Sequence, residues 1–328
     1  AFDGCIGITS LTLPSNLETI GNYAFKNVQI TTIVVPKSVT SIGIGAFQGC
    51  PLESITLPFV GGSRSVSASV ESSKYGSKYL FGYIFGCETG VAGSSSNRIY
   101  QGQPYYSSQN KIYDGYYIPA TLKEVIITDA TGISANVFYG CTMIESLTLN
   151  EGITVIHDKA FYECSSLKSM KVPTTVETIG SYAWRNCSEM TSIQLPKVTE
   201  LSEELLYGCS KLTEIVIPDS VTKIGAHAFN GCTGITSLTI PDQVLVIERN
   251  AFYGCTGIKT VRLSANLKSI GGSAFEGCTG ITVLTLPSNL ETIGSGAFKN
   301  VQITTVVVPK SVTSIGIGAF QGCPLESI

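Results

Sequence analysis

The sequence repeats with a period of 22 or 23 residues, and this period restricts the possible fold more than any other feature. One complete unit is ITSLTIPDQVLVIERNAFYGCTG, residues 235–257. Its first apolar residue has counterparts along nearly the whole chain, at Ile8, Ile30, Leu52, Leu122, Ile144, Leu167, Met190, Leu212, Ile258, Ile281, Ile303 and Leu325. A fixed period of this length is typical of a solenoid, in which each turn buries its apolar face against its neighbours.

Each part of the unit predicts a local structure. The L-x-x-L-x-L pattern of residues 235–240 predicts a short half-buried strand. Pro241 ends this strand, because proline lacks an N–H group and has a fixed φ. Val244 and Ile247 then predict a second short extended segment. The unit closes with Ala-Phe-x-Gly-Cys, for which we predict a single helical or 3₁₀ turn that places Phe252 in the core.

Stacking such units gives a β-rich α/β fold, a right-handed leucine-rich-repeat solenoid. We expect a parallel sheet on its concave face, with short second strands and single helical or 3₁₀ turns on the other walls. The thirteen strand starts predict one solenoid of about 13 turns over residues 1–328. Trp184 and Leu206 occupy the position that is Phe in most units, and we predict that Trp184 is a core substitution.

The cysteines follow the same period. Ten of the eleven occupy one position of the unit: Cys5, Cys50, Cys141, Cys164, Cys187, Cys209, Cys232, Cys255, Cys278 and Cys323. Val28 and Val301 take this position in two units, so it accepts a small apolar side chain that needs no partner. We therefore predict a ladder of buried free thiols. No C-x-x-C pair is present to suggest a metal site, and we expect no cofactor.

The period is interrupted once, between Leu52 and Leu122, by a variant turn that carries two loop insertions within residues 59–121. This segment holds nine of the fifteen tyrosines, together with many Ser and Gly residues, a composition that binding loops favour. Its candidate ligand-binding residues are Tyr75, Tyr79, Tyr100, Tyr105, Tyr106, Tyr113 and Tyr116. The alternative is a flexible loop whose tyrosines pack onto the side of the solenoid. We place Phe85 in the Phe position of this turn.

The outward positions of the predicted concave sheet form a second candidate surface. They are mostly Thr and Ser, and the candidate binding residues among them are Lys168, Lys171, Gln194, Lys259 and Arg262. No aromatic cluster marks a binding hot spot there. A merely solvated strand surface is the alternative. Lys171, Gln194 and Arg262 also interrupt the regular Thr column that ice binding would need.

Several functional classes find no support in the sequence. The net charge of −3 comes without any cluster of basic residues, which argues against nucleic-acid binding. No apolar run is long enough to span a membrane, and no signal peptide is present. The two histidines, His157 and His227, lie three turns apart and in different columns. Without a recognisable catalytic motif, we expect no enzymatic activity.

Residues 1–55 recur as residues 274–328, with 49 of 55 positions identical. This near-copy indicates a recent duplication and predicts that the chain is a fragment of a longer array. It also leaves both ends without the polar capping repeat of a typical solenoid. End-to-end association of exposed apolar ends is therefore a further expectation.

The pattern L-x-x-I-x-L-P-x-x-L-x-x-I-G-x-x-A-F-x-G-C resembles the BspA-like leucine-rich repeats over essentially the whole chain. The resemblance implies a secreted or surface-attached protein of bacterial type. It further implies a role in binding a protein or glycan partner, such as host matrix or another cell. It brings no residue-level binding motif. A structural spacer that displays other domains from the cell surface is the main alternative, and an intracellular scaffold is a third.

Overall fold

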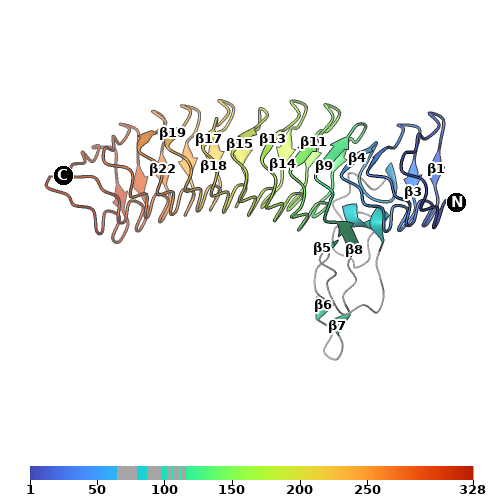
Figure 1. The fold of residues 1–328 in the computed structure, drawn as a ribbon. Helices are drawn as coiled ribbons and strands as arrows, with labels where there is room; N and C mark the ends of the chain where they lie inside the picture. Colours follow the sequence, from blue (N-terminus) through green and yellow to red (C-terminus); the bar gives the residue numbers. More distant parts are fainter. Residues whose placement is uncertain (65–79, 87–97, 102–104, 107–110, 113–115, 328) are drawn as a thin grey trace. The chain divides into compact units, whose positions relative to one another are not determined.

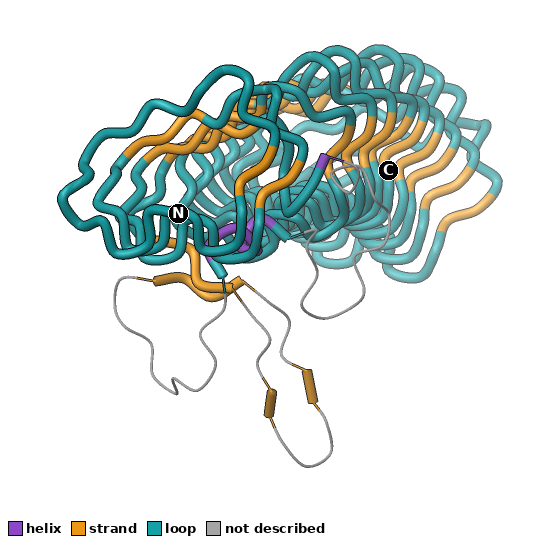
Figure 2. Tube along the Cα trace, turned by 90° about the vertical axis from the view of Figure 1, so that its right-hand side faces the viewer, coloured by secondary structure: helices purple, strands orange, loops and turns teal. Residues whose placement is uncertain are grey.

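The structure is a computed structural model that describes residues 1–64, 80–86, 98–101, 105–106, 111–112 and 116–327. The chain divides into two compact units, Ala1–Thr175 and Val176–Ile328. Each unit is a stack of repeat turns, with strands on two walls and strand-free turns on a third (Figures 1 and 2). The predicted repeat architecture is confirmed within each unit, and a single solenoid over residues 1–328 stays a prediction.

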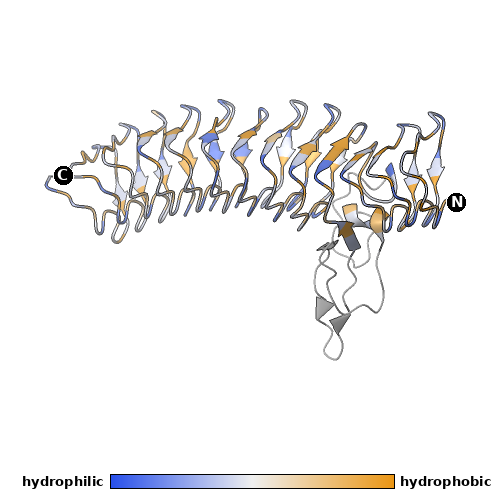
Figure 3. Cartoon of the chain, in the orientation of Figure 1, coloured by the Kyte–Doolittle hydropathy of each residue, from blue (hydrophilic) through white to orange (hydrophobic). Residues whose placement is uncertain are grey.

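In unit 1 the first strands of successive turns form a parallel sheet. Its order is β2, β4, β9, β11, β13, with bounds Thr32–Val34, Ser54–Leu57, Glu124–Ile127, Ser146–Thr148 and Ser169–Lys171. The second strands are two residues long. They pair as β1 (Thr19–Ile20) with β3 (Ser41–Ile42) and as β10 (Gly132–Ile133) with β12 (Val155–Ile156). Apolar and polar residues alternate along each turn, as Figure 3 shows.

In unit 2 the second strands form the continuous wall. The parallel order is β16, β18, β20, β22, β23, β24, with bounds Glu200–Leu201, Lys223–Ile224, Val246–Ile247, Ser269–Ile270, Thr292–Ile293 and Ser314–Ile315. The first strands pair only locally, as β15 (Ser192–Gln194) with β17 (Glu214–Ile215) and β19 (Ser237–Thr239) with β21 (Thr260–Arg262). A further short strand, β14, spans Thr178–Ile179.

The closing segment of each turn differs in detail from the predicted helical or 3₁₀ turn. It is a run of hydrogen-bonded β-turns, in which Ala228, Asn230 and Cys232 each donate an N–H to the carbonyl three residues earlier. The intervening N–H groups of His227 and Phe229 donate instead to the next turn. Left-handed residues two before and two after the Phe position create this alternation, because they reverse the direction of the peptide groups and stop a helix from continuing.

Aromatic rings from the closing turns stack into a column inside each unit. In unit 2, Phe252 lies with its ring centroid 5.1 Å from that of Phe229 and 5.1 Å from that of Phe275. All three rings are fully buried, as is Trp184, which confirms the predicted core substitution. In unit 1, Phe138 and Phe161 stack in the same way at 5.5 Å. These rings supply the largest apolar contribution of each turn.

The variant turn of unit 1 uses two phenylalanines where other turns use one. Its segment η2 (Phe81–Phe85) is a 3₁₀ helix. Phe47 N–H donates to the Ile84 carbonyl, so Phe85 occupies the predicted Phe position toward the preceding turn. Toward the following turn, Phe81 takes over this role, because its N–H donates to the Val137 carbonyl. The insertion therefore keeps the hydrogen bond at the Phe position with the turn on each side.

The inserted segment begins at this same wall. The antiparallel pair β5 (Arg98–Gln101) and β8 (Tyr116–Pro119) lies beside η2, and Tyr117 N–H donates to the Gly86 carbonyl (Figure 1). A second antiparallel pair joins β6 (Tyr105–Tyr106) and β7 (Lys111–Ile112).

All ten cysteines that the structure describes are free, and eight of them are buried, as predicted. Seven of these thiols donate to a backbone carbonyl of the preceding turn. For example, Cys232 Sγ lies 3.1 Å from the Leu206 carbonyl and Cys255 Sγ lies 3.0 Å from that of Phe229. Burial was wrongly predicted for Cys5, which is exposed, and for Cys323, which is half-buried. These two lie in the first and last described turns, where a neighbouring turn covers only one side.

Truncation of the aromatic column tests the core. We expect Phe252→Ala to lower the free energy of unfolding by about 3–5 kcal/mol, because it leaves a cavity between two stacked rings. Tyr253→Ala is the matched control: the next side chain is 41% exposed, and we expect a loss of about 1 kcal/mol or less. Urea unfolding measures both values, and equal losses would contradict the stacked core.

Thiol reactivity tests the cysteine ladder. Burial raises the pKa of Cys209 and of Cys278 to about 12, so neither thiol ionises appreciably near pH 8. We expect iodoacetamide to label Cys5 in the folded protein and to spare Cys209 and Cys278 until denaturant is added. Peptide mapping by mass spectrometry reads out each cysteine. Labelling of Cys209 as fast as that of Cys5 would be inconsistent with a buried ladder.

Candidate functional site

The strand face of unit 1 holds two of the candidate residues. Lys168 and Lys171 are both exposed, at the start and end of the β13 region. Lys168 forms an ion pair with Glu145, which also pairs with Lys123 at 3.1 Å. The hydrogen bond from Lys168 is the largest cause of the lowered pKa of Glu145, followed by that from Lys123. Lys168 therefore belongs to a local surface charge network, whereas Lys171 lies at the other end of the strand.

The strand face of unit 2 holds the other three candidates. Gln194, Lys259 and Arg262 are all exposed, on β15 and at the two ends of the β21 region. Of these, Arg262 lines a groove of about 630 Å³. The groove lies where the pairing of first strands stops, because β17 and β19 belong to different sheets. It is lined by Ile215, Val216, Ile217, Asp219, Ser237, Thr239, Pro241, Asp242, Gln243 and Arg262.

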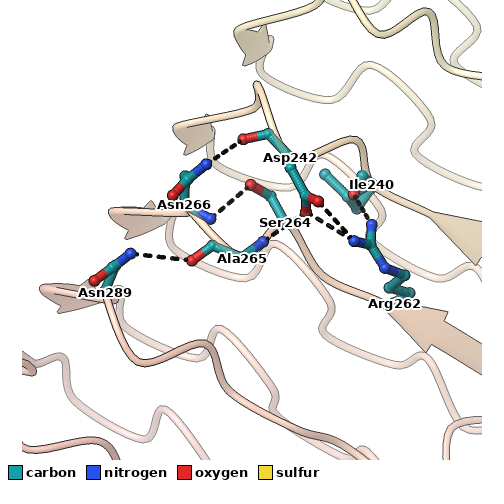
Figure 4. Close-up of polar contacts among 7 residues, drawn as sticks. All are labelled: Ile240, Asp242, Arg262, Ser264, Ala265, Asn266 and Asn289. Atoms are coloured by element: carbon teal, nitrogen blue, oxygen red, sulfur yellow. Dashed lines mark hydrogen bonds and ion pairs between the residues drawn. The ribbon is translucent and has the colours of Figure 1, made fainter.

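A polar corner fixes one side of this groove (Figure 4). Arg262 donates two hydrogen bonds to the carboxylate of Asp242, at 2.9 and 2.8 Å, and a third to the Ile240 carbonyl at 3.3 Å. Ala265 N–H donates to the same carboxylate, and Asn266 Nδ2 donates to the Asp242 carbonyl. The bidentate geometry orients the guanidinium and neutralises the carboxylate. Arg262 therefore acts as part of the groove wall.

The inserted segment is described only in part. Tyr75, Tyr79 and Tyr113 lie outside the described residues. Tyr100 lies on β5, and Tyr105 and Tyr106 form β6. Tyr116 requires a correction: its side chain is only 2% exposed and packs edge-on against Tyr83, with ring centroids 6.0 Å apart. Tyr116 is thus a core residue at the base of the insertion, and it offers no accessible surface to a ligand.

The structure reveals a tyrosine-bearing surface that the sequence interpretation missed. We define the turn wall as the outer surface of the stacked closing turns. All six tyrosines outside residues 59–121 lie on it, either two residues before the Phe position or directly after it: Tyr23, Tyr139, Tyr162, Tyr182, Tyr207 and Tyr253. Tyr83 of η2 also lies two residues before its Phe position. Each of these rings is exposed or half-buried.

In unit 1 this aromatic surface adjoins the insertion. The rings of Tyr139 and Tyr162 are stacked, with centroids 4.9 Å apart and planes 8° apart. Their turns follow directly after η2, whose Phe81 is hydrogen-bonded to the Tyr139 turn through the Val137 carbonyl. The hairpin of β5 and β8 leaves the same wall (Figure 1). Unit 1 therefore groups half-buried tyrosines next to the base of a hairpin.

The sequence did contain a signal for this surface. Outside residues 59–121, tyrosine occurs only two residues before the Phe position or directly after it. The structure adds that the residue two before the Phe position is left-handed in every regular turn of both units. Reading the closing segment as a helical turn gave no reason to expect alternate side chains to point outward. The alternating peptide directions of the β-turns place Phe inside and its two tyrosine-bearing neighbours outside.

In unit 2 the turn wall is charged as well as aromatic. The Arg185 guanidinium lies 4.1 Å from the Tyr207 ring centroid and forms an ion pair with Glu204. His227 has both ring nitrogens 3.2 Å from asparagine side-chain amides. Burial, followed by the nearby Arg249, lowers the pKa of His227 below its usual value. The two asparagine amides thus fix the His227 ring within the wall.

In the described parts of the chain, no three His, Cys, Asp or Glu side chains come together in a way that could hold a metal ion. Nor does any described helix have the length and apolar character needed to cross a bilayer.

Comparison with known proteins gives a consistent identification of the repeat. The sequence profile of the BspA type leucine rich repeat region matches residues 1–67, 110–210 and 199–326, in six copies. No curated protein sequence matches the chain.

Solved structures with a similar fold include a leucine-rich repeat protein from Bacteroides ovatus. It is 23% identical, the match covers 98% of this chain and 72% of that protein, and the TM-score is 0.53. The pneumococcal vaccine antigen PcpA is 21% identical over 67% of this chain and 64% of its own, with a TM-score of 0.46. A leucine rich cell surface protein from Faecalibacterium prausnitzii is 19% identical over 97% and 85%, with a TM-score of 0.37. The similarity to the Bacteroides ovatus protein supports the fold, and nothing about function.

Acid titration tests the corner beside the groove. The Ala265 N–H and then Arg262 hold the pKa of Asp242 below its usual value of 3.8. The ionised carboxylate therefore stabilises the folded protein fully above this value, and the contribution falls as the pH drops through the lower folded-state pKa. We expect the difference in thermal midpoint between wild type and Asp242→Asn to shrink below about pH 4. A difference that stays constant down to about pH 2.5 would rule out this linkage.

Proposed function

The chain belongs to the BspA-type leucine-rich-repeat family, and from this premise we propose that it is a non-catalytic cell-surface module that binds a protein partner. The observation that supports this proposal is the aromatic turn wall of unit 1. Tyr83, Tyr139 and Tyr162 lie there beside the base of the inserted hairpin, each with part of its ring accessible. Tyrosine is enriched at protein interfaces because it combines a large apolar area with a polar hydroxyl group.

The stacked arrangement favours a protein over a glycan. Sugars pack their C–H groups against an open aromatic face, whereas Tyr139 and Tyr162 cover one face of each other. Their ring edges and hydroxyl groups remain for a partner, which suits the mixed apolar and polar surface of a protein. The rings are also held by the repeat backbone, so a partner orders few side chains when it binds. The strand face, rich in Thr and Ser, offers fewer such anchors.

A location at the cell surface agrees with the state of the cysteines. Oxidising compartments convert accessible thiol pairs to disulfides. Here eight thiols are buried, and burial raises the pKa of Cys50, Cys209 and Cys278 to about 12. Thiols that neither ionise nor meet oxidant persist in the reduced form outside the cell. The ladder of free cysteines is therefore compatible with export.

A binding screen tests this function against the spacer alternative. We expect the purified chain to bind at least one member of a panel of fibronectin, laminin, fibrinogen and collagen in biolayer interferometry. The double variant Tyr139→Ser/Tyr162→Ser should lose about tenfold or more in affinity, because it removes two interface anchors. Tyr253→Ser is the matched control, since Tyr253 occupies the same repeat position as both and lies in unit 2.

The outcomes separate the alternatives. If no protein in the panel binds above background, the chain behaves as a spacer. If a protein binds but the double variant binds it as well as wild type does, the turn wall of unit 1 is not the contact surface. Circular dichroism of each variant shows that the solenoid is intact.

A further inference from the structure

The groove of unit 2 contains backbone N–H and C=O groups that do not pair with the neighbouring first strand. In two of the intact pairs of first strands, an N–H just after one strand or near its end donates to the next turn: Val35 to the Thr56 carbonyl at 2.9 Å and Ile240 to the Arg262 carbonyl at 2.8 Å. The corresponding donor in the groove is Ile217 N–H, and the acceptor is the Thr239 carbonyl. No such bond forms between these described residues, nor do β17 and β19 pair at any position.

The unpaired edges line the groove itself. In a parallel ladder, the N–H and C=O groups of one residue point to the same neighbouring strand. By the register of the intact pairs, the groups of Ile215 and Ile217 on one side, and of Ser237 and Thr239 on the other, would join β17 to β19. All four residues line the groove. Without a strand partner, these groups are left to pair with water or with a bound ligand.

The rest of unit 2 remains closed across this interruption. On the turn wall, Leu206 N–H donates to the Ala228 carbonyl and Gly208 N–H to the Asn230 carbonyl, both at 2.8 Å. On the second-strand wall, β16 pairs with β18 and β18 with β20. The groove is therefore a local opening of one wall, in turns that are fixed to each other on the other two. First strands are likewise absent from residues 281–287.

The side chains of the groove have a definite chemical character. Val216 is 79% exposed, and the polar residues Ser237 and Thr239 line the groove with it. Asp242 is neutralised by Arg262, whereas Asp219 has no cationic partner among the described side chains. The groove thus combines one open apolar anchor with one uncompensated negative charge, and the unpaired strand edges run alongside both.

From these features we propose that the groove binds an extended peptide segment of a partner protein, with a small apolar side chain on Val216 and a Lys or Arg side chain opposite Asp219. The peptide backbone pairs with the exposed edge of Ser237 and Thr239, in the manner of strand addition to a sheet. An extended peptide matches the three features together: it supplies alternating N–H and C=O groups, an apolar side chain and a cation. This site lies in unit 2 and does not depend on the turn wall of unit 1.

Peptide selection followed by affinity measurement tests the proposal. We expect a phage-displayed library of random heptapeptides to yield, on the wild-type chain, sequences that place Val, Ile or Leu beside Lys or Arg. A synthetic peptide of the selected sequence should lose more than about tenfold in affinity for Val216→Glu, which puts a charge at the anchor. For Asp219→Asn the loss should be about two- to fivefold and should vanish near 1 M salt.

Two controls isolate the groove and the backbone contacts. Val307→Glu changes a valine in the same repeat position that is 80% exposed and lies away from the groove, and it should bind as wild type does. A peptide N-methylated at alternate amides should bind at least about tenfold more weakly, because it cannot donate to a strand edge. Equal enrichment on wild type and Val216→Glu, equal binding of the methylated peptide, or selection of acidic sequences would each overturn the proposal.

Discussion

The fold depends on the hydrogen bonds that join the closing segments of successive turns. In each closing segment, alternate N–H groups point to the next turn, as those of His227, Phe229 and Gly231 do. In the regular turns, left-handed residues at two positions set this direction. Most residue types adopt that conformation only at a cost of roughly 1–2 kcal/mol, yet Lys159, Tyr182 and others do so here. The stacked Phe rings beneath these bonds offset that cost.

Because the closing segments join successive turns, strand pairing and loop length can differ from turn to turn. In unit 2 the closing turns and second strands continue unchanged past the point where β17 and β19 separate. In unit 1, η2 keeps the hydrogen bond at the Phe position on both sides, because Phe85 faces the preceding turn and Phe81 the following one. A long insertion therefore fits between two regular turns. The hydrogen bonds between closing segments thus permit both candidate binding regions, a groove in one unit and a hairpin with tyrosines in the other.

Much of this architecture could be predicted from the repeat. The period locates the Phe column, the buried cysteines and the first strands that form, because each depends on one residue type at one position. It also predicted strands at residues 8–13 and 281–286, where the structure has none. The conformation of the closing segment was harder to predict, because residues as different as Gly, Asn, Glu, Lys and Tyr occupy its left-handed positions. Without that conformation, the outward direction of Tyr139 and Tyr162 could not be derived. Nor could the burial of Tyr116, which follows from its contact with Tyr83.

The interruption between β17 and β19 also had no sequence signal, because Glu214–Ile215 and Ser237–Thr239 both fit the strand pattern. Amide hydrogen exchange measured residue by residue tests most directly whether closing-turn bonds persist where the sheet of first strands is interrupted. We predict slow exchange at Phe229 and Phe252, and fast exchange at Ser237 and Thr239 in the absence of ligand. Protection of Ser237 and Thr239 equal to that of Phe252 would contradict this prediction.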